Sequence, residues 1–160
     1  MRLKTPIIFC LLMHIFTSCE GYEINKDKTS TKSFLGDVIV TNSDGSKFID
    51  KDIRVTLSES LNDKGLYDLF LKKVKFAEKM PVRINMTIPS VEKDLDGNVS
   101  GNNIIPWAMG GPFEKWEIHD LKGIVTYSNN NEPKSLQFDM ICGEYPVSYF
   151  GIYTEEIIDY

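Results

Sequence analysis

The sequence has few of the residues on which common catalytic and metal sites depend. Its 160 residues include 3 Cys and 2 His. It contains no Cys-x-x-Cys motif, which excludes the usual zinc-ribbon and dithiol redox sites. A Ser-His-Asp or Cys-His site would have to use His119, because the other histidine lies in the N-terminal segment, and no Gly-x-Ser-x-Gly elbow accompanies it. His119 and Asp120 are neighbours in a predicted strand, so they should face opposite sides.

The sequence also lacks an apolar run long enough to span a bilayer, which takes about 20 residues. Its longest apolar stretch, 6–16, follows Arg2 and Lys4 and leads through Phe-Thr-Ser into Cys19. This layout is typical of a bacterial lipoprotein signal. We therefore predict a signal peptide over 1–18, lipidation of Cys19 and a membrane anchor. A plain secretory signal, or a buried apolar strand, is the alternative.

Basic charge is scarce as well. Without the first 18 residues, which hold two bases and no acid, the chain carries 16 Lys and Arg against 23 Asp and Glu. No run of basic residues stands out, so the sequence argues against a nucleic-acid ligand. With Cys10 in the signal and Cys19 lipidated, Cys142 is left without a disulfide partner. Its place at the end of an alternating apolar run predicts a buried structural thiol.

In contrast to these absences, the sequence has apolar residues at every second position in many segments. The predicted anchor and tether together cover 19–33: residues 20–33, after Cys19, are polar and predict a flexible tether, so the domain should cover 34–160. Within it, apolar and polar residues alternate as in half-buried antiparallel strands. The strands expected are 35–41, 53–57, 67–71, 82–88, 116–119, 122–127, 136–142 and 147–153.

Turn-forming residues separate these segments. Asn-Ser-Asp-Gly at 42–45, Asn-Asp-Lys-Gly at 62–65 and three asparagines at 129–131 tolerate positive φ. Asp-x-Asp-Gly-Asn at 94–98 partly matches a calcium loop, but its glycine comes too early and no closing Glu follows, so we interpret it as a hairpin turn. About eight strands with short turns predict an all-β, antiparallel, up-and-down barrel, with a sandwich as the alternative.

The order of these segments resembles a known family. A Tyr-Asp-Leu strand at 66–74 leads into Met-Pro-Val at 80–82, and a glycine-marked hairpin, Leu-Lys-Gly at 121–123 and Leu136 to Gly143, follows. The pattern resembles the calycin-like β-barrel lipoproteins of Bacteroidetes over about 34–151. The resemblance implies a lipocalin-like barrel and an outer-membrane location in the cell envelope, and it supplies no catalytic residue.

One segment, 104–113, is apolar but broken by two prolines and paired glycines, which fits neither a strand nor a polar loop. It is interpreted either as a lid that completes the core or as the mouth of a pocket. Aromatic residues near the C-terminus have the same two interpretations: they either pack in the core or contact a ligand or partner. The candidate contacts for a ligand or partner are Trp107, Met109, Phe113, Trp116, Tyr145, Tyr149 and Phe150.

These features predict a function in binding, without catalysis, metal or cofactor. The first hypothesis is an envelope-anchored barrel that holds a small apolar or amphipathic ligand or docks an envelope protein. The second is a structural or adhesion-type lipoprotein whose barrel is filled by side chains. The third is a hydrolase that uses two carboxylates, drawn from Glu114, Glu117, Asp120, Asp139 and Glu144.

Overall fold

The computed structural model describes residues 31–155. The predicted signal segment, Cys19 and most of the predicted tether lie outside these residues. The regular secondary structure of the described part is all β-strand apart from one short 3-10 helix, η1, at Glu114–Trp116. No helix in this part of the chain has the length and apolar character needed to cross a membrane. The strands are β1 Lys32–Thr41, β2 Lys47–Glu59, β3 Tyr67–Val74, β4 Ile84–Lys93, β5 Asn98–Gly101, β6 Trp107–Ala108, β7 Gly111–Pro112, β8 Ile118–Tyr127, β9 Pro133–Cys142 and β10 Tyr145–Tyr153.

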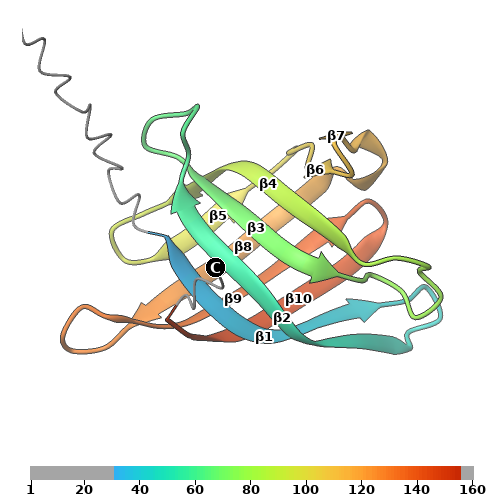
Figure 1. Cartoon of the computed structure of the whole chain (residues 1–160), viewed down its shortest axis with the longest axis horizontal. Coiled ribbons are helices and arrows are strands. Elements are labelled where there is room, and N and C mark those ends of the chain that lie inside the picture. Colours follow the sequence, from blue (N-terminus) through green and yellow to red (C-terminus); the bar gives the residue numbers. More distant parts are fainter. Residues whose placement is uncertain (1–30, 156–160) are drawn as a thin grey trace, which may run out of the picture.

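Eight of these strands form a closed antiparallel barrel (Figure 1). Each of β1, β2, β3, β4, β5, β8, β9 and β10 pairs with its neighbour in this order, and β10 pairs with β1 to complete the ring. The remaining two, β6 and β7, form a small hairpin that extends from β4 outside the ring. The predicted up-and-down barrel is therefore confirmed, and the sandwich alternative is wrong.

Three differences from the predicted strands have local causes. The predicted strands 116–119 and 122–127 are one strand, β8, which bends through a bulge where Asp120 takes a φ of 50°. Trp116, where the first of these strands was predicted to begin, belongs instead to η1. The eighth strand of the barrel is β5, which sequence patterning missed because its four residues carry only one large apolar side chain, Val99.

The interior of the barrel is filled by side chains. Inward positions of every barrel strand contribute to one apolar cluster, which includes Phe34, Leu57, Leu71, Met86, Leu121, Leu136 and Phe138. Tyr149 belongs to this cluster: it is 2% exposed, and its ring stacks on Phe138 at 5.2 Å. Its hydroxyl lies 3.0 Å from the Phe34 carbonyl and 3.2 Å from that of Ile53. A ligand would therefore bind at an end or on the outer wall of the barrel.

The two ends of the barrel are built differently. The near end carries the start of β1, the end of β10 and three short connections. The far end carries the β1–β2 hairpin, the β3–β4 loop, the long connection that contains η1, and the tight β9–β10 turn. In Figure 1 the chain enters at the left, and the far end lies at the right. Longer connections leave room for a recess at the far end.

Candidate functional site

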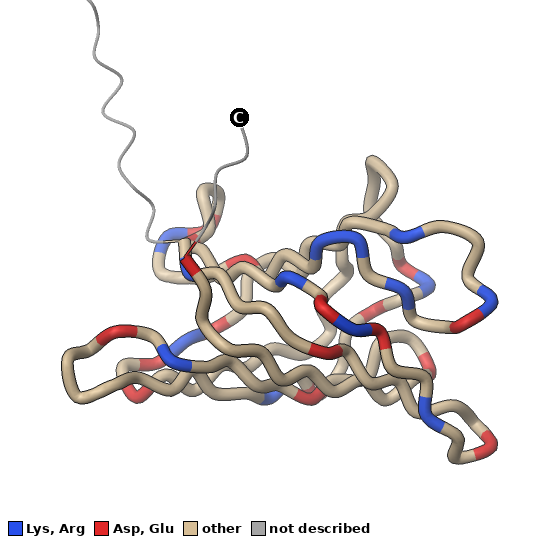
Figure 2. Tube along the Cα trace, turned by 60° about the horizontal axis from the view of Figure 1, so that its bottom comes forward, with Lys and Arg blue, Asp and Glu red and all other residues tan. Residues whose placement is uncertain are grey.

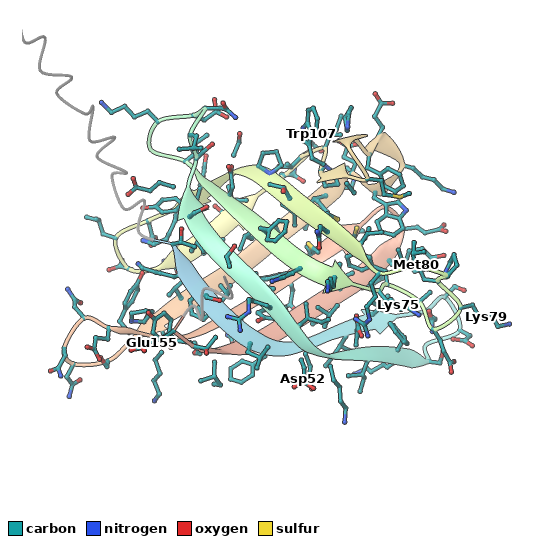
Figure 3. All side chains as sticks on the ribbon, viewed as in Figure 1. Asp52, Lys75, Lys79, Met80, Trp107 and Glu155 are labelled. Atoms are coloured by element: carbon teal, nitrogen blue, oxygen red, sulfur yellow. The ribbon has the colours of Figure 1, made fainter. Side chains whose placement is uncertain are left out.

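A recess of about 370 Å³ opens at the far end of the barrel. We call it the end pocket. One wall comes from the β3–β4 loop and the other from η1 and the β9–β10 turn, which are far apart in sequence. The residues lining it are Phe76, Ala77, Lys79, Met80, Lys115, Trp116, Cys142, Glu144 and Tyr145. Its size falls within the range of small-molecule sites, which begins at about 300 Å³. Figure 3 shows Lys79 and Met80 at this end of the barrel.

Aromatic contacts hold one wall of the end pocket in place. The Trp116 ring meets Phe76 edge to face, with ring centroids 5.0 Å apart, and Phe113 in the same way at 5.1 Å. The backbone N–H of Trp116 donates to the Phe113 carbonyl, which closes the turn of η1. Phe76 itself is 6% exposed and belongs to the core cluster. The Trp116 ring is thus braced from two sides while part of its surface faces the recess.

The polar groups of the end pocket are charged and mixed in sign. Lys79 and Lys115 lie on opposite walls of the recess, and Glu144 is the acidic residue among those that line it. All three residues are exposed, whereas Phe76 and Cys142 at the inner side are buried. The pocket is therefore apolar in its depth and charged around its opening. This arrangement suits a molecule with an apolar body and one polar end.

Cys142 lies at the inner side of the end pocket as a neutral thiol. Burial raises the pKa of Cys142 to about 12. Its Sγ lies 3.8 Å from the Trp116 carbonyl, to which the thiol donates. Because the thiolate is the reactive form, this cysteine is held in its unreactive state at neutral pH. The predicted burial of Cys142 is confirmed.

The raised pKa of Cys142 predicts a stability change at high pH. The thiol ionises near pH 9 in the unfolded chain but only near pH 12 in the folded protein. The contribution of the neutral thiol to the free energy of unfolding is fully present below pH 9. It is lost as pH rises from 9 to 12, by about 1.4 kcal/mol per pH unit. Urea unfolding at pH 8, 9.5 and 10.5 should show a steeper loss for wild type than for Cys142→Ala. Equal pH slopes in the two proteins would contradict the assignment.

His119 is held by groups other than Cys142. Its Nδ1 lies 3.1 Å from Asn103 Oδ1, and its Nε2 lies 3.8 Å from Glu117 Oε2. Glu117 and His119 are two residues apart, so they share a face of the chain, as alternation requires. Among the described hydrogen bonds and ion pairs, none joins His119 to the neighbouring Asp120. The backbone N–H of Asp120 donates to Asn102 Oδ1. The described contacts do not assemble a Cys-His or His-Asp pair.

The other candidate contacts are dispersed. Trp107 and Met109 lie on the β6–β7 hairpin, where they are 55% and 73% exposed beside an outer groove of about 670 Å³. Figure 3 shows Trp107 apart from Lys79 and Met80. Phe150 is exposed on the outer wall, paired with Asp37 of β1. The structure therefore brings together Phe113, Trp116 and Tyr145, but not Trp107, Met109 or Phe150.

Tyr149 does not reach the surface, so its candidate role as a ligand or partner contact is corrected to a core role. Segment 104–113, which contains Trp107, Met109 and Phe113, is neither wholly a lid nor wholly a pocket wall. Pro106 and Ala108 are buried, whereas Trp107 and Met109 point outward. Only Phe113, through its contact with Trp116, supports the end pocket.

The acidic residues do not converge on a metal. No group of three or more His, Cys, Asp or Glu within residues 31–155 has the arrangement of a metal site.

Asp94 stabilises the predicted hairpin turn at 94–98, because its carboxylate accepts hydrogen bonds from the side chain and backbone of Asn98. These bonds hold the pKa of Asp94 below its usual value. Gly97, at a φ of 91°, completes the same turn.

Several residues of the end pocket were missed by sequence reasoning. Phe76, Lys79 and Met80 lie in a connection between predicted strands, and Lys115 lies in a segment predicted as a loop. Their usable signal was the pair of apolar residues, Phe76 and Met80, within an otherwise charged loop. An apolar side chain in such a loop indicates packing against another element. The partner element, η1, is not evident from the sequence.

Comparisons with known proteins give no relative. No family model matches the chain, and neither the curated proteins nor the solved structures contain a match. The resemblance to calycin-like lipoproteins therefore stays a prediction, whereas the closed antiparallel barrel is a feature of the structure.

Proposed function

We propose that this protein is a non-catalytic binding protein that takes a small amphipathic ligand in the end pocket. The observation that carries the proposal is the aromatic recess of about 370 Å³ at the far end of a filled barrel. Phe76, Met80 and Trp116 would contact the apolar body of the ligand. Lys79 and Lys115 at the opening would attract an anionic head group such as a carboxylate.

The position of the end pocket agrees with a surface-anchored protein. β1 begins at the near end, opposite the pocket (Figure 1). If Cys19 carries a lipid, as we propose, the chain would enter the barrel from the membrane side. The end pocket would then open away from the membrane, where it can meet ligands in the surrounding fluid. The proposal places the protein in the cell envelope.

Ala77→Trp tests the proposal by filling the end pocket. Ala77 is exposed and lines the recess, so an indole there would occupy the space without removing a core contact. We expect the affinity for dodecanoate, measured by isothermal titration calorimetry, to fall at least about tenfold, which corresponds to 1.4 kcal/mol. Dodecanoate serves as the probe because it combines an apolar chain with a carboxylate.

The matched control is Leu95→Trp, which adds the same indole at the opposite end of the barrel. Leu95 is fully exposed in the β4–β5 turn, so the variant should bind dodecanoate as wild type does. Unchanged affinity in Ala77→Trp would refute the end pocket as the binding site. An equal loss in both variants would also refute it, because the effect would then not depend on position.

A further inference from the structure

The outer wall of the barrel carries a second recess with a different character. It is an open, shallow recess of about 370 Å³ across β2, β3 and the end of the β3–β4 loop. Five of its lining residues are basic and one is acidic: Lys51, Arg54, Lys72, Lys73 and Arg83, with Asp52. We call it the basic pocket. It is separate from the end pocket, with which it shares no lining residue.

This concentration of positive charge contrasts with the rest of the molecule. The whole chain has a net charge of −5. In Figure 2 the basic stretches of β2, β3 and the following loop lie next to one another on one side of the barrel. Arg54 of β2 is directly paired with Lys72 of β3. Like charges in this position destabilise a sheet, so the unliganded protein retains the cluster at a cost in stability.

Two adjacent β-bulges create the basic pocket. In β2, Lys51 and Asp52 together oppose Asp37 of β1, and Asp52 takes a φ of 57°. In β3, Lys72 and Lys73 together oppose Asn85 of β4, and Lys73 takes a φ of 53°. Regular pleating would turn one residue of each pair toward the core. The bulges expose both residues of each pair. The side chains of Lys51, Asp52, Lys72 and Lys73 therefore all lie on the outer wall of the barrel.

The left-handed backbone at these bulges is unusual for residues other than glycine. Such conformations cost of order 1–3 kcal/mol each and gather at functional sites. The bulge in β3 is held by a hydrogen bond from the Lys73 N–H to Asn85 Oδ1, at 2.9 Å. The bulge in β2 is held by one from the Asp52 N–H to Asp37 Oδ1, at 3.3 Å. Side chains of neighbouring strands thus fix the geometry of both.

The basic side chains of the pocket are of two kinds: the two arginines are held by hydrogen bonds within the protein, and the three lysines form no ion pair among the described residues. Arg83 donates to both carboxylate oxygens of Asp50 and to the Lys73 carbonyl, each at 2.8 Å. Arg54 donates to the buried Ser33 Oγ at 2.8 Å. By contrast, the ammonium groups of Lys51, Lys72 and Lys73 form no ion pair with any carboxylate in residues 31–155. The pocket therefore has an ordered guanidinium frame and three lysines without a counterion.

We propose that the basic pocket binds a doubly charged oxoanion, namely a phosphate group. Its positive charges exceed its single lining carboxylate, even after Arg83 is assigned to Asp50. Ammonium and guanidinium groups around one recess match the tetrahedral oxygens of phosphate, with charge-assisted hydrogen bonds. The phosphate could be carried by a small soluble molecule or by a lipid head group, since both present the same chemistry.

The test uses the paired variant Lys72→Gln with Lys73→Gln and two phosphate probes. Inorganic phosphate at pH 7.5 should shift amide NMR signals of residues 51–54 and 72–73 in wild type, and the apparent Kd should rise at least about tenfold in the variant. Vesicles of phosphatidylcholine with phosphatidic acid form the second arm, read by co-sedimentation. The control variant, Lys122→Gln with Lys134→Gln, removes the same charge from exposed positions on β8 and β9.

Each outcome decides the proposal. Phosphate shifts that the paired variant loses and the control keeps support a soluble phosphate ligand. Vesicle binding lost only in the paired variant, without phosphate shifts, supports a lipid head group. Equal losses in the two variants would show a general charge effect and overturn the proposal. No binding of either probe to wild type would overturn it as well.

Discussion

Replacing Gly36 by alanine should destabilise the barrel by about 3–5 kcal/mol, at the upper end of overpacking effects. A Cβ at this position would lie 1.9 Å from the Phe150 carbonyl oxygen and 2.4 Å from the Cα of Gly151. Both are backbone atoms of β10, which pairs with β1 at this point. Relief would require the two strands to separate where the barrel closes. Urea unfolding followed by circular dichroism measures the loss.

Gly111→Ala is the matched control for Gly36→Ala. A Cβ at Gly111 would have no heavy atom within 4 Å, so its free energy of unfolding should stay within about 0.5 kcal/mol of wild type. If Gly36→Ala is as stable as the control, β1 and β10 are not packed as described. The comparison separates the effect of crowding from that of adding a methyl group.

Replacing Arg83 by leucine is the second change with a large expected effect. Asp50, with a side chain 4% exposed, accepts two hydrogen bonds from Arg83 and one from the Lys75 N–H. Without Arg83, a buried carboxylate keeps only the backbone donor. Breaking a buried pair costs about 3–5 kcal/mol. Because the Arg83 side chain is 43% exposed and water can enter, we expect about 2–4 kcal/mol in chemical unfolding.

The double variant Asp50→Leu with Arg83→Leu gives the sharper result. It removes the carboxylate together with its partner, so no uncompensated charge stays behind. We expect the double variant to be more stable than Arg83→Leu alone. If the second substitution instead lowers stability further, the loss in Arg83→Leu comes from packing and not from the uncompensated charge of the buried Asp50 carboxylate.

The barrel was predictable because most of its strands carry a stretch in which apolar and polar residues alternate. Val55 and Leu57, or Leu69 and Leu71, face the core in the phase that the sequence indicates. The role of Tyr149 was harder to assign, because both faces of β10 carry apolar side chains. Tyr149 shares a face with the buried Val147, whereas Phe150 and Ile152 on the other face are exposed. In such a strand, alternation shows which residues share a face, but it does not show which of the two faces points into the core.

The two recesses could not be predicted from the sequence for a common reason. Each is formed by segments that are distant in sequence, and each depends on irregular backbone. The end pocket needs η1 to face Phe76 of the β3–β4 loop. The basic pocket needs bulges at Asp52 and Lys73, and a pattern of period two cannot reveal where an extra residue is inserted. No basic run stood out because its residues come from β2, β3 and a loop.

The pairing of β1 with β10 sets the order in which this protein can fold. Phe34 meets Tyr153 across that pair, so the first and last strands of the barrel are neighbours. A ring of this kind stays open, with two unpaired edges, until the last strand has been synthesised. Contacts between such distant segments form slowly. A chain emerging from the ribosome therefore cannot close its barrel until β10, which ends at Tyr153, has left the exit tunnel.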